Sequence, residues 1–230
     1  MVRQVICALD TGNLDEAIAT VRRLSPWVNT FKIGHGLTLP NGLSCIDKLQ
    51  DAGAERVFLD LKFHDIPNSV GLAVREAAKH HVWMMTLHLT GGPAMLSAAV
   101  EEANAYSAEK RPLLVGVSVL TSLDQATLTE HLGVNRTIEE HMVKLSKDAI
   151  DLQLDGVVCS AYEIKPIRNA IGKHGIIVTP GIRLSGPTHD QKRVGTPQQA
   201  IADGADYLVI GRALTDAQEP EAVLAEIGLE

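Results

Sequence analysis

The chain has 230 residues, of which 45% are hydrophobic and 21% charged, and its formal net charge is −7. A chain of this length can bury a large core, so we expect one globular domain over residues 1–230. The acidic balance argues against nonspecific binding to nucleic acid or to an anionic membrane, since both favour a basic surface. An anionic small-molecule substrate stays possible, because a local pocket can be basic.

The cysteines Cys7, Cys45 and Cys159 are widely spaced and form no CxxC motif or Cys/His metal pattern. We therefore expect reduced thiols, a cytoplasmic location and no bound metal. The apolar run that follows Met1 is too short for a signal peptide. No stretch of the sequence approaches the ~20 apolar residues that span a bilayer.

Short apolar runs alternate with amphipathic segments along the whole chain. Runs rich in Val, Ile and Leu predict buried strands, and apolar residues spaced three or four apart predict helices. The predicted strands are Gln4–Asp10, Phe31–Gly34, Arg56–Lys62, Trp83–Leu89, Leu113–Leu120, Gly156–Ser160, Ile176–Ile182 and Tyr207–Gly211. The predicted helices are Leu14–Leu24, Leu43–Ala52, Ser69–Lys79, Met95–Ala105, Ile138–Leu152, Ala161–Ile171, Pro197–Ala202 and Glu219–Ile227.

This alternation predicts an α/β fold with parallel strands joined by crossover helices. Eight such repeats close naturally into a (β/α)8 TIM barrel, which usually has ~250 residues. An open, doubly wound sheet is the alternative, and it normally carries a glycine-rich dinucleotide-binding turn after its first strand. The first predicted strand is instead followed by Thr11, Gly12 and Asn13, so the sequence favours the barrel.

Charged residues lie near the ends of the first three predicted strands, where barrel enzymes place their chemistry. Asp10 ends the first strand, Lys32 lies on the second, and Asp60 and Lys62 lie on the third. Because side chains alternate along a strand, Asp60 and Lys62 point to the same side. A purely structural ion-pair network is one interpretation, but buried ion pairs stabilise folds poorly. The pattern favours a protonated lysine held rigidly in a pocket.

A second set of candidates follows the last two predicted strands. Arg183 comes after the seventh strand, and Gly211 and Arg212 come after the eighth. TIM barrels commonly bind phosphate in these two loops, and arginine can contact phosphate through two parallel hydrogen bonds. A salt bridge within the loops is the alternative role for either arginine. The irregular segment Leu184–Arg193 is long enough to act as a lid over this end.

Other catalytic patterns are missing from the sequence. The sequence contains no HxH or HExxH motif of the kind that binds zinc. Ser118 lies in GVSV rather than in a GxSxG elbow, so it does not indicate a serine nucleophile. His88 ends the fourth predicted strand, so we expect it near the pocket as a supporting hydrogen-bond donor.

The run Asp60–Asn68, DLKFHDIPN, resembles the signature of the orotidine 5′-phosphate decarboxylase family. Its DxKxxD core is shared with relatives that act on sugar phosphates. The continuation Ile66–Asn68, together with Gly211 and Arg212, makes the resemblance specific. Further similar segments follow in the family's order, namely Val5–Asp10, Phe31–Gly34, Val115–Ser122, Asp155–Ser160, Thr179–Arg183 and Ile210–Arg212.

The resemblance implies a homodimeric barrel without a cofactor that removes CO2 from orotidine 5′-phosphate to give UMP. It implies that Lys62 donates a proton, that Asp60 lies near the departing carboxylate, and that Asp65 reaches the site from the partner subunit. It implies that Asp10 and Lys32 contact the ribose and anchor Lys62, which makes Lys32 part of the catalytic set. The other implied contacts are Ile66 and Ser69 from the partner, Thr121 with the pyrimidine, Pro180 and Gln191 near base and phosphate, and Arg183, Gly211 and Arg212 with the phosphate.

Two departures from the family pattern are visible. Ser69 stands where many members have threonine, and it keeps the hydroxyl. The loop Leu184–Asp190 differs in length and composition from that of other members.

Two other functions remain open. One is a metal-dependent sugar-phosphate decarboxylase or synthase of the same superfamily. The other is a non-catalytic nucleotide-binding barrel, which could use Arg212 but would not need Asp60, Lys62 and Asp65.

Overall fold

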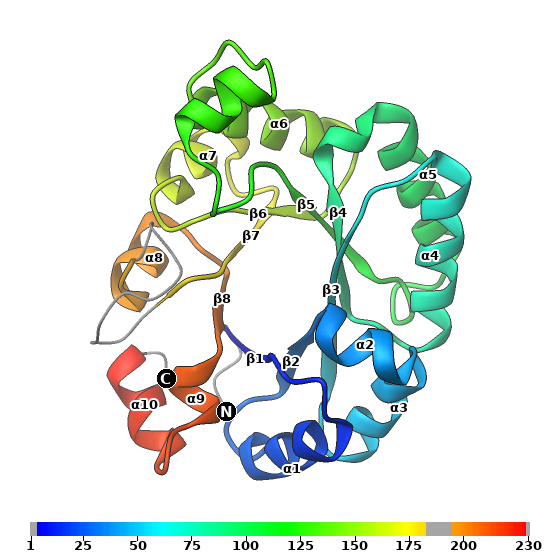
Figure 1. Ribbon diagram of the computed structural model, residues 1–230, viewed down its shortest axis with the longest axis vertical. Coiled ribbons are helices and arrows are strands. Elements are labelled where there is room, and N and C mark those ends of the chain that lie inside the picture. The colour runs from blue at the N-terminus through cyan, green and yellow to red at the C-terminus, as the bar shows by residue number, and fades with distance from the viewer. Residues whose placement is uncertain (1–3, 183–194, 229–230) are drawn as a thin grey trace.

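The computed structural model describes residues 4–182 and 195–228. Within them, eight parallel strands form a closed barrel whose strand order follows the chain (Figure 1). The predicted TIM barrel is therefore confirmed, and the open sheet is excluded. Arg183, Gln191 and the segment Leu184–Arg193 lie outside the described residues.

Every predicted strand and helix is present, although several are shorter than predicted, and the helices His35–Asn41 and Arg212–Thr215 have no counterpart among the predicted ones. The strands are β1 (Val5–Leu9), β2 (Thr30–Ile33), β3 (Arg56–Phe63), β4 (Met84–His88), β5 (Leu113–Val117), β6 (Gly156–Val158), β7 (Ile176–Thr179) and β8 (Tyr207–Ile210). The helices are α1 (Leu14–Leu24), α2 (His35–Asn41), α3 (Ser44–Asp51), α4 (Pro67–Lys79), α5 (Gly92–Asn104), α6 (Ile138–Asp151), α7 (Ile164–Ile171), α8 (Pro197–Asp203), α9 (Arg212–Thr215) and α10 (Pro220–Ile227), with short turns η1 (Leu89–Gly91) and η2 (Thr127–His131).

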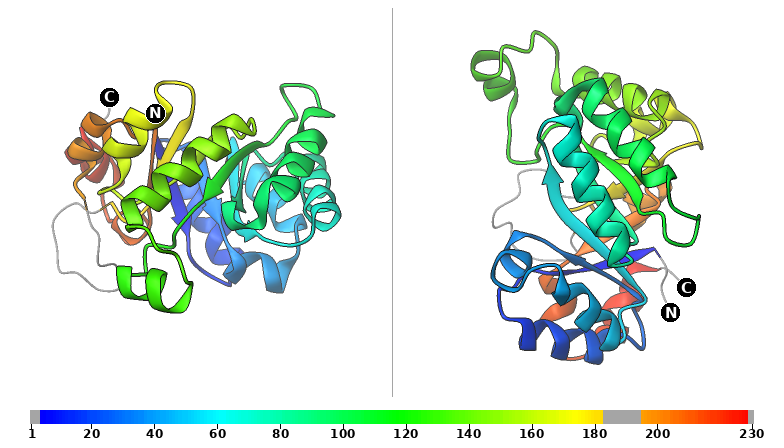
Figure 2. Two further views of the ribbon diagram at one scale, coloured as in Figure 1. Left: turned by 90° about the horizontal axis from the view of Figure 1, so that it is seen from above. Right: turned by 90° about the vertical axis from the view of Figure 1, so that its right-hand side faces the viewer.

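Each strand has one face toward the surrounding helices and one toward the inside of the barrel. Figure 2 shows the helices covering the outside of the barrel. On β3, Val57 and Leu59 pack in the layer between strands and helices. Phe58 belongs instead to a separate cluster inside the barrel. Because successive side chains alternate, Asp60 is the next inward position after Phe58. The interior cluster comprises Ile6, Ala8, Phe58, Met84, Val115, Val178 and Val209.

Two helices, α1 and α4, begin soon after the charged ends of β1 and β3, and residues at their first turns favour a helix start. Asn13 caps α1, and its side chain accepts hydrogen bonds from the N–H groups of the next turn. Pro67 begins α4, where its fixed φ suits the first helical turn and its missing N–H costs nothing. These starts fix the loops that follow β1 and β3. None of the helices in the described residues is long and apolar enough to cross a membrane.

Candidate active site

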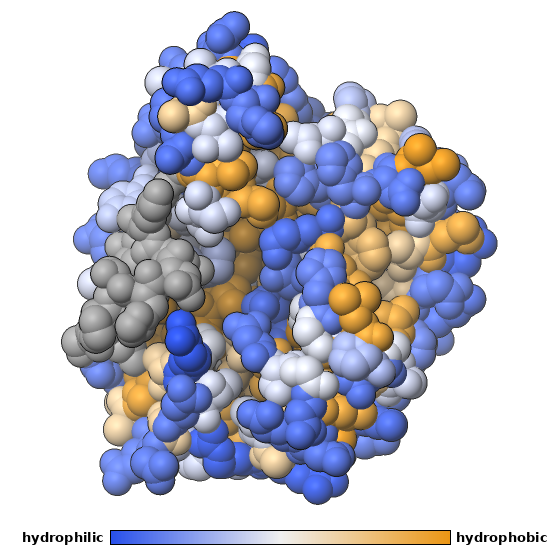
Figure 3. Space-filling model, viewed as in Figure 1, coloured by the Kyte–Doolittle hydropathy of each residue, from blue (hydrophilic) through white to orange (hydrophobic). Residues whose placement is uncertain are grey.

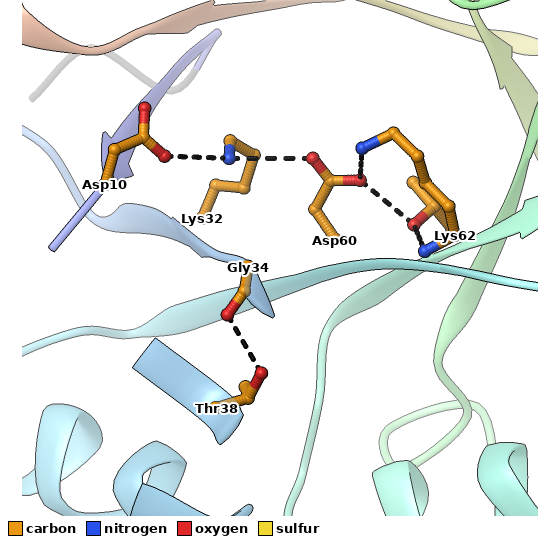
Figure 4. Close-up of polar contacts among 7 residues, drawn as sticks. Asp10, Lys32, Gly34, Thr38, Asp60 and Lys62 are labelled. Carbon is orange, nitrogen blue, oxygen red and sulfur yellow. Dashed lines mark hydrogen bonds and ion pairs between the residues drawn. The ribbon is translucent and has the colours of Figure 1, made fainter. Parts of the chain in front are cut away.

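Four charged side chains form a continuous row at the carboxyl end of β1, β2 and β3 (Figure 4). Lys32 Nζ lies 3.4 Å from Asp10 Oδ1 and 3.5 Å from Asp60 Oδ2. Lys62 Nζ donates a hydrogen bond to Asp60 Oδ1 at 2.8 Å. The order of charges is therefore negative, positive, negative, positive, and Asp60 is shared by two lysines from neighbouring strands.

The middle of this row is buried and its ends are open. The side chains of Lys32 and Asp60 are 13% and 15% exposed, whereas those of Lys62 and Asp10 are 36% and 72% exposed. The side chain of Lys62 is therefore accessible to solvent, while Asp60 contacts its ammonium from the more buried side. Lys62 has a left-handed backbone, with φ of 51°, which is uncommon for a residue other than glycine.

Two opposing effects set the charge state of Asp60. Burial raises the pKa of its carboxyl, but the charges of Lys32 and Lys62 and the hydrogen bonds from Lys62 and Thr86 outweigh burial. The pKa therefore lies below its ordinary value, and Asp60 is ionised near neutral pH. A carboxylate in this state attracts the Lys62 ammonium and orients it through the hydrogen bond at 2.8 Å.

Thr86, on β4, is a site residue that the sequence analysis missed. Its side chain is buried and contacts both the backbone of Lys62 and the carboxylate of Asp60. One signal was available, because a polar residue stands here in the otherwise apolar run that leads to His88. It shares the inward parity of Met84, which lies inside the barrel.

Asp65 and Ile66 lie beyond the row, in the turn between β3 and α4, and Ser69 lies in the first turn of α4. Asp65 accepts a hydrogen bond from the backbone N–H of Ile66 at 2.6 Å. No ion pair joins Asp65 to Lys62 within the residues that the structure describes. Asp65 is exposed, and Ile66 is 65% exposed although it is apolar. This turn therefore presents an acidic and an apolar side chain outward from the single chain.

A stacked pair of imidazoles supports the same turn. His64 and His88 have ring centroids 5.1 Å apart and planes 16° from parallel, and Thr90 Oγ1 lies 2.6 Å from His88 Nδ1. Burial, followed by the charges of His64 and Lys62, lowers the pKa of His88. His88 thus borders the pocket as a neutral ring and contacts the turn rather than the row of charges.

The corner formed by Gly211 and Arg212 lies next to the other end of the row. β8 pairs with β1, and a Cβ placed on Gly211 would lie 3.7 Å from Asp10 Oδ2. Arg212 follows as the first residue of α9 and is exposed. The barrel therefore brings this cationic residue to the same rim as Lys32, although the two are far apart in sequence.

The remaining predicted contacts occupy the loops that follow β5 and β7. Thr121 lies in the turn after β5, and Pro180 directly follows β7; both are partly buried. Figure 3 shows a hollow near the centre of one face of the molecule, with hydrophilic residues beside hydrophobic ones along it. Among the described residues, no group of three or more His, Cys, Asp or Glu side chains could hold a metal ion.

Comparison with known proteins identifies the family. Residues 3–227 match the orotidine 5′-phosphate decarboxylase / HUMPS family. The chain belongs to this family. The resemblance carried by the run Asp60–Asn68 is thereby confirmed.

Relatives and solved structures agree with this assignment. Orotidine 5′-phosphate decarboxylase of Neisseria meningitidis serogroup C is 44% identical over 97% of this chain and 90% of its own length. The enzyme of that name from Vibrio cholerae serotype O1 is 45% identical over 97% of this chain and 96% of its own. The crystal structure of orotidine 5′-phosphate decarboxylase from Lactobacillus acidophilus is 32% identical, with a TM-score of 0.84 over 98% of this chain and 97% of its own.

Proposed function

We propose that this protein decarboxylates orotidine 5′-phosphate to UMP and CO2, with residues 1–230 acting as one catalytic domain. The observation that carries the proposal is the row Asp10, Lys32, Asp60 and Lys62 at the barrel rim. Family membership over residues 3–227 supports it. A row in which the Asp60 carboxylate holds the accessible Lys62 ammonium suits a reaction in which negative charge develops beside that ammonium.

Loss of CO2 leaves an electron pair on C6 of the pyrimidine. The Lys62 ammonium stabilises this carbanion electrostatically, and because Asp60 already holds it in place, little reorganisation is needed during the reaction. Lys62 then gives its proton to C6 as a general acid. Asp60 orients the Lys62 ammonium, and Lys32 contacts the other oxygen of Asp60 while lying near the ribose with Asp10.

The non-reacting parts of the substrate supply binding energy. Arg212 and Gly211 contact the phosphate, together with Arg183, and Thr121 and Pro180 contact the base. Gln191 lies near base and phosphate in the same proposal. Binding energy gained at the remote phosphate offsets the cost of ordering the reactive pocket.

We also propose a homodimer that shares its active sites. Asp65, Ile66 and Ser69 of one subunit complete the site of the other, which accounts for a carboxylate and an exposed isoleucine on the turn after β3. Mixing inactive Asp65→Ala and Lys62→Ala proteins tests this, because hybrid dimers regain one intact site. No regain after verified subunit exchange would contradict a shared site.

The cell compartment proposed is the cytoplasm. Cys7, Cys45 and Cys159 are buried free thiols, which suits a reducing environment. Fractionation of cells that produce the protein at natural levels tests this location.

The decisive experiment follows the ultraviolet spectrum of orotidine 5′-phosphate after the protein is added. Conversion to the UMP spectrum by the wild type, but not by Lys62→Ala, supports the proposal. The same assay in excess EDTA tests the metal-dependent sugar-phosphate alternative. That alternative predicts that orotidine 5′-phosphate is not converted, and that any activity the protein has is lost when the metal is removed. Tight nucleotide binding without turnover would favour the non-catalytic barrel.

A further inference from the structure

β3 and β4 pair with an irregular register beside the charged row. Leu59 pairs with Met85, and the next pair is Phe63 with Leu87. Three residues of β3, Asp60 to Lys62, therefore lie opposite the single residue Thr86. A bulge of this kind leaves backbone groups without ladder partners and turns side chains away from strict alternation.

Lys62 lies within this bulge, and its backbone conformation is unusual. Its φ of 51° lies in the left-handed region, which costs free energy for a residue that carries a Cβ. Such a conformation persists only where surrounding contacts hold it. Here it brings the Lys62 ammonium back onto Asp60, at 2.8 Å.

The hydroxyl of Thr86 makes the contacts that hold this bulge. Thr86 Oγ1 accepts a hydrogen bond from the backbone N–H of Lys62 at 2.8 Å, and it donates to Asp60 Oδ1 at 3.1 Å. The residue is 1% exposed, so water does not replace these bonds. A hydroxyl is both donor and acceptor, and one group therefore satisfies both partners.

We propose that Thr86 is a positioning residue for catalysis, which fixes the left-handed backbone of Lys62 and orients Asp60 so that the ammonium faces the reacting carbon. This inference rests on the proposed decarboxylase function. The groups that face Asp60 come from three strands: Lys32 from β2, Lys62 from β3 and Thr86 from β4. Of these, Thr86 alone also bonds the Lys62 backbone.

Replacing Thr86 with valine tests the proposal, because the shape is kept and the hydroxyl is lost. Thr86→Val is expected to lower kcat roughly 100-fold, the scale of a ~1 Å misplacement of a catalytic group. KM should change little, since no substrate contact is removed. Thr86→Ser keeps the hydroxyl and should restore most of kcat.

Thr38→Val is the matched control. Thr38 is also a buried threonine, on α2 directly after β2, but among the described residues its hydroxyl bonds only the carbonyl of Gly34 at the start of its own helix (Figure 4). It should keep wild-type kcat. If Thr86→Val fails to fold, Thr86→Ser and Thr86→Cys decide instead, because they match in shape and the thiol is a far weaker hydrogen-bond partner.

Crystal structures give a readout that does not depend on activity. In Thr86→Val, Lys62 should leave the left-handed region, and its ammonium should move away from Asp60. Unchanged kcat, an unchanged Lys62 backbone, or a serine variant as impaired as the valine variant would each overturn the proposal. A wild type that leaves orotidine 5′-phosphate unchanged would refute the proposed function alone, because the Lys62 backbone would still test the role of Thr86.

Discussion

The two ends of the barrel use buried charge in different ways. At the carboxyl end, the Asp60 carboxylate contacts three side chains of the candidate active site, namely Lys32, Lys62 and Thr86. At the amino end, the carboxylate of Asp155 accepts both from the Arg111 guanidinium and from the backbone N–H of a neighbouring strand. The charges at the carboxyl end belong to the candidate active site, whereas those at the amino end hold neighbouring strands together.

Within residues 4–182 and 195–228, a second carboxylate is arranged like Asp155. Asp206 directly precedes β8, accepts a hydrogen bond from the Ile177 backbone N–H at 2.7 Å, and pairs with Arg168. Asp155 directly precedes β6 and accepts from Leu114 N–H at 2.7 Å. In each case the carboxylate accepts from the second residue of the neighbouring strand, one position before the first residue pair of that ladder, Val115 with Gly156 or Val178 with Tyr207. Changes at the two ends should therefore separate activity from stability.

Removing the ammonium should have the largest effect. Lys62→Ala is expected to lower turnover at least ~10⁴-fold, since both charge stabilisation and proton donation are lost. Affinity for UMP and the midpoint of thermal unfolding should stay close to wild type. Spectrophotometric turnover and calorimetric titration with UMP measure these quantities. Turnover within tenfold of wild type would remove Lys62 from the mechanism.

Breaking an amino-end pair should do the reverse. Asp155→Ala leaves the Leu114 N–H and the Arg111 guanidinium without their shared acceptor, so we expect a loss of roughly 2 kcal/mol in the free energy of unfolding. Urea denaturation measures this, and kcat should be unchanged below the transition. Asp148→Ala is the control, because Asp148 pairs with Lys144 on the exposed surface. Equal losses in both variants would contradict the strand-fixing role.

The protonation of Asp60 sharpens the comparison further. The lowered pKa of Asp60 means that folding favours its ionised form, so this contribution to stability is present above the ordinary pKa and is lost as pH falls through the folded pKa. Lys62→Met removes one cation and one hydrogen bond, and the pKa should rise because burial is less opposed. Carbon-13 NMR titration of the Asp60 carboxyl measures the change.

A surface lysine provides the control for that titration. Lys144→Met also removes one positive charge, but it lies on α6, away from the row. It should leave the Asp60 titration where it is in the wild type. A wild-type curve in the Lys62→Met protein would mean that Lys62 does not stabilise the Asp60 carboxylate.

The barrel could be predicted from sequence because its signals are local. Each strand is a short apolar run, and α1 matches its predicted bounds, Leu14–Leu24, where Asn13 provides a cap. The meeting of Asp60 with Lys32 also follows from sequence, because neighbouring parallel strands end at one rim. These inferences need only strand parity and strand order.

The features that escaped prediction depend on contacts between distant segments. The bulge opposite Thr86 is a matter of register between β3 and β4, and no pattern within β3 alone reveals the left-handed backbone of Lys62. α2 contains Gly36 and Pro40, which disfavour helices, and it forms where Asn41 can donate to backbone carbonyls. Tertiary context outweighs local propensity in both places.

The smallest predicted effect concerns Arg23, which lies outside the row of charges and holds the segment that follows Arg212. Arg23, on α1, donates to the carbonyls of Thr215 at 2.6 Å and Ala217 at 3.0 Å. Thr215 is the last residue of α9, the single-turn helix that begins at Arg212, and Ala217 lies two residues beyond it. A helix of one turn is marginal alone, so the guanidinium stabilises it at its negative end.

Arg23→Met keeps much of the side-chain length and removes these hydrogen bonds. We expect UMP to bind about three- to tenfold more weakly, the equivalent of one hydrogen bond, because Arg212 is less firmly placed. Uridine, which lacks the phosphate, should bind as it does to the wild type. Arg22→Met, from the neighbouring exposed arginine, controls for the loss of charge. Equal weakening for UMP and uridine would show that Arg23 supports the fold in general rather than the phosphate end.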